Sequence, residues 1–358
     1  MDETISQAGK DQLAGDIAEI LEDRSIDWSR FDGRSIAVTG ATGAIASLLV
    51  RALAGYAHSA GKSLAIFAMV RNRNKAETMF VQEISDGYVH VIDWDPLAER
   101  QDPDFKADYM VHAASVTASK VYVEKPVDTI LTNTEGTASV LKYAKDAHVK
   151  SLVYLSTMEV YGASEDDNEI KENRFFPLDC AVVRSSYPES KRIAETMCVA
   201  YASQYSVPVK IARLVQTVGI EGNRADGKVV SEFAGCAIDG RKIVLLTRGD
   251  TARSFLYSTD AVRAILQILL NGENGVAYNV ANASNYCTIK EMAEIVCDEY
   301  HLPLYIAADS LQAESRGWYT HVVRLNLDTS RLTGLGWNPQ ISIREMFRRI
   351  VGAWRCAL

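Results

Sequence analysis

The chain has 358 residues, which is enough for one large domain or two interlocked ones. Apolar residues make up 47% and charged residues 23%, and the net charge of −8 disfavours a nucleic-acid or anionic membrane surface as the main partner. No apolar run approaches the ~20 residues that cross a bilayer, and the acidic N-terminus does not resemble a signal peptide, so we expect a cytoplasmic protein without membrane contact.

The predicted elements begin with a helix at 11–24, whose apolar residues recur at helical spacing. We expect this helix to dock on the main domain or on a partner subunit. From residue 34 the sequence predicts strands at 35–40, 63–70, 88–94, 108–115 and 151–157, and helices at 44–57, 126–147 and 187–206. Short apolar strands that alternate with helices predict a doubly wound parallel sheet, that is, a Rossmann-type α/β fold covered on both faces.

After about residue 213 the alternation weakens, and the pattern predicts a helix that ends at Gly240, a strand at 242–246 and helices at 258–272, 288–300 and 342–354. We expect three parts. They are an N-terminal helical extension (1–33), a dinucleotide-binding Rossmann domain (34–215 plus 251–274) and a smaller, interleaved substrate-binding lobe (216–250 plus 275–358). Ligands of open α/β sheets bind at the carboxyl edge, so the cleft is expected between the two lobes.

The stretch "VTGATGAIA" at 38–46 places glycines between the first strand and the first helix in a GxxGxxA pattern. Glycine is required where the turn is tight and where the backbone approaches a pyrophosphate. The N-terminus of the following helix offers free N–H groups to the phosphates. The pattern therefore predicts a dinucleotide site that includes Gly40, Thr42, Gly43, Ala44 and Ile45.

The loop after the second strand, "MVRNRNK", bears on the type of cofactor. Many related folds place an acidic residue there, which binds the adenosine ribose of NAD. This chain has Arg71, Arg73 and Lys75 instead, and positive charge suits the 2′-phosphate of NADP. Solvated loop charges are the alternative interpretation, so NAD and NADP both stay open. Asp93, at the end of the third strand, is expected to mark the adenine pocket.

The stretch "SSYPESKRIAE" carries Tyr187 and Lys191, which stand four residues apart and hence on one face of a helix. A tyrosine must lose its proton to act as a base near neutral pH, and a neighbouring ammonium favours the phenolate. Thr157, 30 positions upstream at a strand end, can hold the same substrate hydroxyl. Together with the glycine-rich turn, this combination indicates oxidation or reduction of an alcohol.

From about residue 35 to residue 352 the chain resembles the extended short-chain dehydrogenases/reductases of the NAD-dependent epimerase/dehydratase group, which act on nucleotide sugars. The matching stretches include "VTGATGAIA", "VHAAS", "STMEVYG", "YPESK" and "GLGWNPQISIREM". Within this group, "TNTEGT", "DGKVVSEF" and "TARSFLYSTD" look most like UDP-glucuronate decarboxylases. The resemblance implies a NAD cofactor, a nucleotide-sugar substrate and a homodimer formed through the helices at 126–147 and 187–206.

The resemblance also implies roles for single residues. Thr157, Tyr187 and Lys191 would be the catalytic trio, and Glu159 stands where dehydratases and decarboxylases carry a glutamate. Glu159 could instead hydrogen-bond the turn in which it stands. The other candidate cofactor contacts are Arg71, Asp93, Trp94, Ala113, Ala114 and Asn133, and the candidate substrate contacts are Ser115, Met158, Gln216, Val230 and Arg253. Arg253 would meet the diphosphate. The six scattered cysteines contain no CxxC pair, so no metal site is expected.

Two departures from the family pattern affect the expected outcome. Met158 replaces the serine of the decarboxylases and the aspartate of the 4,6-dehydratases, and Gln216 replaces the usual asparagine. We expect oxidation of the sugar at C4 followed by chemistry at C5, either decarboxylation or epimerisation. The alternatives are a 4-epimerase, a 4,6-dehydratase, a plain NADP-dependent reductase, or an inactive dinucleotide-binding module.

Overall fold

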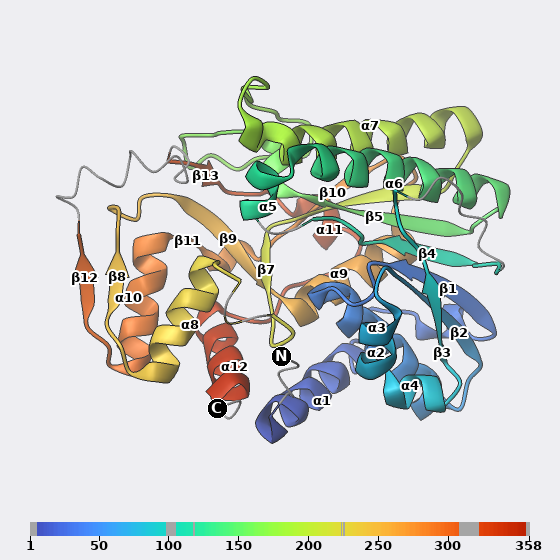
Figure 1. Cartoon of the computed structure of the whole chain (residues 1–358), viewed down its shortest axis with the longest axis horizontal. Coiled ribbons are helices and arrows are strands. Elements are labelled where there is room, and N and C mark those ends of the chain that lie inside the picture. The colour runs from blue at the N-terminus through green and yellow to red at the C-terminus, as the bar shows by residue number, and fades with distance from the viewer. Residues whose placement is uncertain are drawn as a thin grey trace.

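The large sheet of the protein contains seven parallel strands in the order β10-β6-β5-β4-β1-β2-β3 (Figure 1). The computed structural model describes residues 6–97, 105–116, 119–222, 224, 226–307 and 322–355. The strands are β1 (Arg34–Thr39), β2 (Leu64–Val70), β3 (Val89–Asp93), β4 (Tyr109–His112), β5 (Ser151–Thr157), β6 (Val209–Leu214) and β10 (Ala277–Val280). The doubly wound parallel sheet predicted from the sequence is confirmed.

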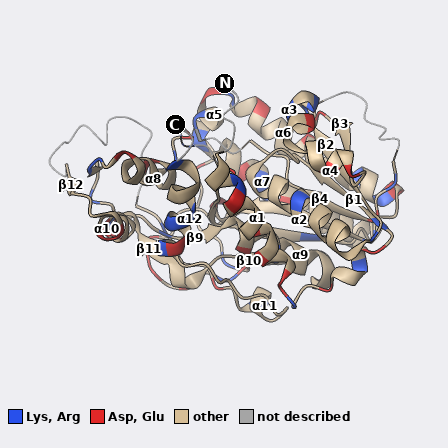
Figure 2. Ribbon diagram, turned by 90° about the horizontal axis from the view of Figure 1, so that it is seen from below, with Lys and Arg blue, Asp and Glu red and all other residues tan. Residues whose placement is uncertain are grey.

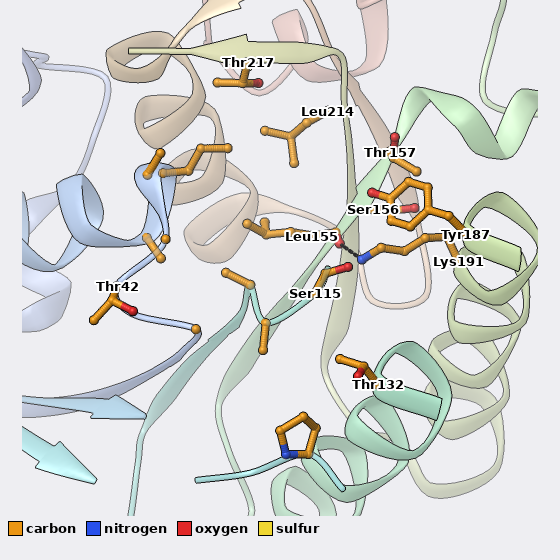
Figure 3. Close-up of a pocket in the computed structure, with 18 of the residues that line it drawn as sticks. Thr42, Ser115, Thr132, Leu155, Ser156, Thr157, Tyr187, Lys191, Leu214 and Thr217 are labelled. Carbon is orange, nitrogen blue, oxygen red and sulfur yellow. Dashed lines mark hydrogen bonds between the residues drawn. The ribbon is translucent and has the colours of Figure 1, made fainter. Parts of the chain in front are cut away.

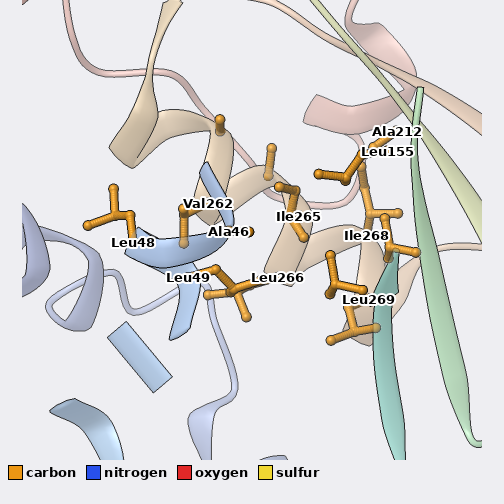
Figure 4. Packing of buried hydrophobic residues seen from close by; sticks show 14 of the residues in the cluster. Ala46, Leu48, Leu49, Leu155, Ala212, Val262, Ile265, Leu266, Ile268 and Leu269 are labelled. Atoms are coloured by element: carbon orange, nitrogen blue, oxygen red, sulfur yellow. The ribbon is translucent and has the colours of Figure 1, made fainter. Parts of the chain in front are cut away.

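Helices cover both faces of this sheet. α6 (Pro126–Asp146) and α7 (Ser186–Tyr205), with the short α5 (Ser119–Glu124), pack on one face, and α2 (Ala44–Ala60) and α9 (Ser258–Asn271) pack on the other. Side chains of successive strand residues point to opposite faces, so Ala37 lies in the core under α6 and α7 while Val38 lies in the core under α2 and α9. Figure 4 shows the latter core, where Leu49 of α2 lies near Leu266 of α9.

In the described residues, the smaller lobe contains two short sheets and three main helices. β7 (Gln216–Val218), β9 (Ala252–Tyr257), β11 (Tyr286–Thr288) and β13 (Arg324–Leu325) form one sheet, and β8 (Ile243–Leu245) pairs with β12 (Leu304–Ile306). The helices are α8 (Val229–Asp239), α10 (Ile289–Tyr300) and α12 (Ile343–Arg355). Thr288 and Glu291 form a capping box that fixes the start of α10. In this lobe the helix patterns read from the sequence correspond to real helices.

Further short helices and 3₁₀ turns occur among the described residues. They are α3 (Arg73–Met79), α4 (Val81–Ser85), α11 (Ser330–Thr333) and 3₁₀ turns at Trp28–Phe31, Met158–Tyr161, Val183–Ser185 and Ala283–Asn285. Within the described ranges, no helix combines the length and apolar character that a membrane crossing requires. Basic and acidic positions are interspersed along the described ribbon (Figure 2).

The N-terminal helix α1 (Gln7–Leu21) packs on the same chain, against α2, α9 and α12. Its Asp16 is buried and accepts hydrogen bonds from the Tyr257 hydroxyl at 2.6 Å and from the Arg349 guanidinium at 3.1 Å. Its Ile17 would lie 3.3 Å from a Cβ atom added at Gly55, so α1 and α2 approach closely. The helix therefore joins the large sheet's outer helices to the C-terminal helix of the smaller lobe.

The strand pairing differs from the sequence analysis in two places. We expected 251–274 to belong with the large sheet, but within that stretch β9 lies in the small sheet and only α9 covers the large one. We assigned 275–358 to the smaller lobe, yet β10 pairs with β6 and completes the large sheet. The Asn279 amide of β10 also donates to the carbonyls of Ile170 and Asp328, which ties the strand to two distant segments of the chain. Such distant partners leave no local pattern in a four-residue strand.

Two glycines at positive φ provide a matched test of the turn after β1. Gly40 (φ 64°) and Gly61 (φ 61°) both lie in the left-handed region, where a side chain costs roughly 1–2 kcal/mol. A Cβ atom at Gly40 would also lie 2.8 Å from the Ala114 Cα, whereas nothing lies within 4 Å of one at Gly61. We therefore expect Gly40→Ala to lower the free energy of unfolding, measured in urea, clearly more than Gly61→Ala. Equal losses would contradict the close approach of the two turns.

Candidate active site

A cavity of about 610 Å³ lies at the carboxyl edge of the large sheet. Its walls come from the segments that follow five neighbouring strands: residues 40–46 after β1, 69–72 at the end of β2, 113–115 after β4, 155–159 at the end of β5 and 214–217 at the end of β6. Helix residues such as Tyr187 and Lys191 also line the cavity, and the smaller lobe contributes Lys228 and Arg253. The order of the sheet reverses between β1 and β4, and ligands of open α/β sheets bind at such a point.

The turn between β1 and α2 has the properties of a phosphate cradle. Gly43 caps α2 without a side-chain hydrogen bond, and residues 43–46 line the cavity. The first backbone N–H groups of a helix lack partners within that helix, and the positive end of its dipole attracts anions. Thr39 holds the opposite turn in place, since its hydroxyl accepts hydrogen bonds from the N–H groups of Ala113 and Ala114 at 3.1 Å. These residues fit the pyrophosphate of a dinucleotide.

Tyr187 and Lys191 of α7 meet Thr157 at the end of β5 (Figure 3). The buried Lys191 ammonium donates a hydrogen bond to the Leu155 carbonyl at 2.9 Å, and burial lowers its pKa to about 7. Burial also raises the pKa of the Tyr187 phenol, and the negative charge of Glu159 adds to this, while a hydrogen bond with Thr157 opposes the shift. The three side chains can therefore share the hydroxyl of one substrate.

The buried ion pair of Glu195 and Arg213 places a negative charge close to Lys191. Glu195 stands one turn after Lys191 on α7 and accepts two hydrogen bonds from the Arg213 guanidinium, at 2.6 and 3.1 Å, to one carboxylate oxygen. Ser156, between Leu155 and Thr157, donates to the other oxygen of Glu195 at 2.5 Å. The negative charge of Glu195 partly offsets the effect of burial on the pKa of Lys191. Glu195 therefore helps to keep the ammonium charged.

Two side chains that the sequence did not predict, those of Tyr122 and Arg184, stack in turn over Tyr187. The ring of Tyr122 lies parallel to that of Tyr187, with centroids 4.2 Å apart, and the Arg184 guanidinium lies 4.8 Å from the Tyr122 centroid. Arg184 also donates to both carboxylate oxygens of Glu159, at 2.8 and 3.1 Å. In the sequence, the one sign that Arg184 belongs to this site is its position, three residues before Tyr187. No local pattern connects Tyr122 with this site.

Most of the predicted site residues line this one cavity. They are Gly40, Thr42, Gly43, Ala44, Ile45, Arg71, Trp94, Ala113, Ala114, Ser115, Thr157, Met158, Glu159, Tyr187, Lys191, Gln216 and Arg253. Asn133 lies behind the wall, where it accepts from Ser115 and donates to Ser190.

Two of the predicted contacts lie away from the cavity. Asp93 forms an ion pair with Arg73 and does not line the wall. Val230 is buried in the core of the smaller lobe, with Phe233 and Tyr257. As ligand contacts both residues stay predictions, because a motif gives the position of a residue in the chain but not the neighbours that its side chain finds.

Known proteins share this architecture and its motifs. The model of the NAD dependent epimerase/dehydratase family matches residues 36–281. The chain belongs to this family. It is 32% identical over 253 residues to UDP-glucuronic acid decarboxylase 1 of Danio rerio, covering 69% of this chain and 57% of the relative. It is 31% identical to UDP-glucuronic acid decarboxylase 5 of Arabidopsis thaliana, covering 67% of this chain and 68% of the relative.

Solved structures of the family show the same fold. The dTDP-glucose 4,6-dehydratase DesIV of Streptomyces venezuelae, solved with NAD and TYD bound, has a TM-score of 0.73 and 25% identity, covering 90% of this chain and 97% of that chain. The UDP-glucose 4-epimerase of Thermus thermophilus, solved with NAD, has a TM-score of 0.72 and 22% identity, covering 90% of this chain and 100% of that chain. Family members and homologues of this chain are thus NAD-dependent enzymes that modify nucleotide sugars.

The lowered pKa of Lys191 predicts a pH dependence of stability. Its pKa is about 7 in the folded protein and has its ordinary value of 10.5 in the unfolded chain, so the unfolded chain binds more protons between these values. The Lys191 contribution to stability therefore rises as pH increases from about 7. We expect the unfolding free energy of the wild type to increase between pH 7 and pH 9 relative to that of Lys191→Met, measured by urea unfolding. Parallel pH curves for the two proteins would contradict the burial of a titrating ammonium.

Proposed function

We propose that this protein is a nicotinamide-dependent enzyme that oxidises a nucleotide sugar at C4 and then acts at C5. The observation that carries the proposal is the convergence of Thr157, Tyr187 and Lys191 in a cavity that also contains a phosphate cradle. Arg253 also lines this cavity, and its Nε atom is buried and has no hydrogen-bond partner among the described residues. A guanidinium in that state suits an anionic ligand group such as the diphosphate of a nucleotide sugar.

The first step requires a base and a hydride acceptor. The turn at 40–46 and the residues at 113–115 would hold the dinucleotide, whose oxidised nicotinamide accepts a hydride when bound. Tyr187 takes the proton of the C4 hydroxyl, and Thr157 orients that hydroxyl. Lys191 lowers the free energy of the Tyr187 phenolate because a positive charge close to the ring favours the charged form. Oxidation at C4 then makes the hydrogen on C5 acidic and a C5 carboxylate easy to lose.

Glu159 is the second group that could act on the sugar. It lines the cavity, and its ion pair with Arg184 at 2.8 Å holds the carboxylate beside Thr157 and Met158, where a general base could reach the sugar. Met158 also lines the cavity but carries no proton, so it cannot protonate a departing 6-hydroxyl as an acid would. These side chains disfavour direct 4,6-dehydration. Decarboxylation and C5 epimerisation are the leading outcomes.

A nucleotide-sugar 4-epimerase is the second candidate. The Arg184 guanidinium contacts both oxygens of Glu159, and a carboxylate held in this way can simply fix the turn after β5. Rotation and re-reduction of a 4-ketone need no base beside Tyr187. In this case Glu159 would be structural.

The outcome can be measured with a panel of UDP-, CDP-, dTDP- and GDP-sugars and mass detection. Loss of carbon dioxide, loss of water or an unchanged mass identifies decarboxylation, dehydration or epimerisation.

Tyr187→Phe should lower turnover by about 10²-fold or more because it removes the base, while Tyr205→Phe on the exposed surface of the same helix should not. Glu159→Gln should abolish solvent deuterium uptake at C5. Full product and normal uptake in this variant would instead favour the 4-epimerase.

We further propose that the protein forms a homodimer through α6 and α7. The large apolar side chains Val127, Ile130, Ile193, Val199 and Tyr205 are exposed on these two helices. Long helices with several exposed apolar residues are typical of surfaces that pack against a second copy.

Oligomeric mass tests this interface. We expect light scattering to give twice the mass of the chain at micromolar concentration for the wild type, and the mass of one chain for Ile193→Asp. The control is Val81→Asp on α4, which is 63% exposed, compared with 51% for Ile193, but lies outside the proposed interface. A wild-type protein with the mass of one chain would contradict the proposal.

A further inference from the structure

The end of β2 carries a free positive charge beside the cofactor side of the cavity. Arg71 directly follows β2 and lines the cavity. Within the part of the chain that the structure describes, no hydrogen bond or ion pair engages its guanidinium. Folds that bind NAD place an acidic side chain at this position for the ribose 2′-hydroxyl, whereas an arginine there accommodates a 2′-phosphate.

The neighbouring Arg73 forms an ion pair with Asp93, so Arg71 is the guanidinium that remains free to bind a ligand. Arg73 donates to Asp93 from Nε at 2.9 Å and from Nη2 at 2.8 Å, and Nη2 also donates to the Val91 carbonyl at 3.1 Å. This pairing neutralises Asp93 at the end of β3, which does not line the cavity. Among the described residues that do line it, Glu159 is the only carboxylate, and it is paired with Arg184.

A second cation, Lys75 of α3, lies beside the turn after β1. Its ammonium lies 3.4 Å from the Thr42 carbonyl, in the turn that cradles phosphate, and both residues line the cavity. One guanidinium and one ammonium therefore flank the wall between the end of β2 and the turn after β1. No acidic side chain among the described wall residues competes with a phosphate there.

We propose that Arg71 and Lys75 bind the 2′-phosphate of the cofactor, so that this chain prefers NADP to NAD. The guanidinium supplies paired donors to phosphate oxygens, and the ammonium supplies a point charge. The proposal rests on the proposed function only in that the cavity holds a nicotinamide dinucleotide. It holds for any sugar and for any outcome at C5.

The test is a direct titration by calorimetry of protein freed of bound nucleotide, with NADP⁺ and NAD⁺ in separate experiments. We expect the wild type to bind NADP⁺ at least tenfold more tightly than NAD⁺. Arg71→Gln should lose most of this ratio by weakening NADP⁺ while leaving the Kd for NAD⁺ within about threefold, because NAD lacks the group that Arg71 contacts. Lys75→Gln should lower the ratio by a smaller factor.

Arg34→Gln is the matched control, because it removes the same charge at the opposite end of β1 and should keep the wild-type ratio. Equal or tighter binding of NAD⁺ by the wild type would overturn the proposal, and so would an unchanged ratio in Arg71→Gln. Failure to bind either dinucleotide would overturn the proposed function as well. A preference for NADP⁺ without turnover of any nucleotide sugar would support the inference and count against the proposed substrate class alone.

Discussion

The hydrogen bond from the buried Lys191 ammonium to the Leu155 carbonyl is the contact on which the active-site geometry depends. A buried charge is costly unless it is paired, and here the carbonyl, the Tyr154 ring at 4.8 Å and the charge of Glu195 share that task. The bond ties α7 to the end of β5. Tyr187, one helical turn earlier, must then lie beside Thr157, and the Tyr122 ring can stack on it.

The pair of Glu195 and Arg213 makes this arrangement rigid. The Arg213 guanidinium also contacts the Tyr161 hydroxyl and the Glu172 carbonyl, so it joins β6 to the segment after β5. Ser156 connects the same carboxylate to the strand that carries Thr157. Buried networks of this type specify one geometry because each unpaired member would lose its hydrogen bonds without gaining water. The placement of the reactive groups is thus set by polar contacts within an apolar core.

The charge of the cavity contrasts with the charge of the whole protein. The chain has a net charge of −8, yet the described wall contains one carboxylate and several cations: Arg71, Lys75, Lys191, Lys228 and Arg253. A cleft lined by one sign of charge raises the local concentration of ligands of the opposite sign. A dinucleotide and a nucleotide sugar are both anionic, so one cavity can attract both. The smaller lobe supplies two of these cations, Lys228 and Arg253, so both lobes contribute to the charge of the cavity.

The sequence by itself determined the parallel sheet, the glycine-rich turn and the pairing of Tyr187 with Lys191. Each of these follows from local physics: residue periodicity, φ at Gly40, and the spacing of one helical turn. Only the tertiary structure decided that β10 joins the large sheet, that Asp93 turns to Arg73, that Val230 faces a core, and that Tyr122 lies on Tyr187. Those contacts join residues 20 or more positions apart or depend on packing between elements, and no local pattern encodes which distant partner a side chain will meet.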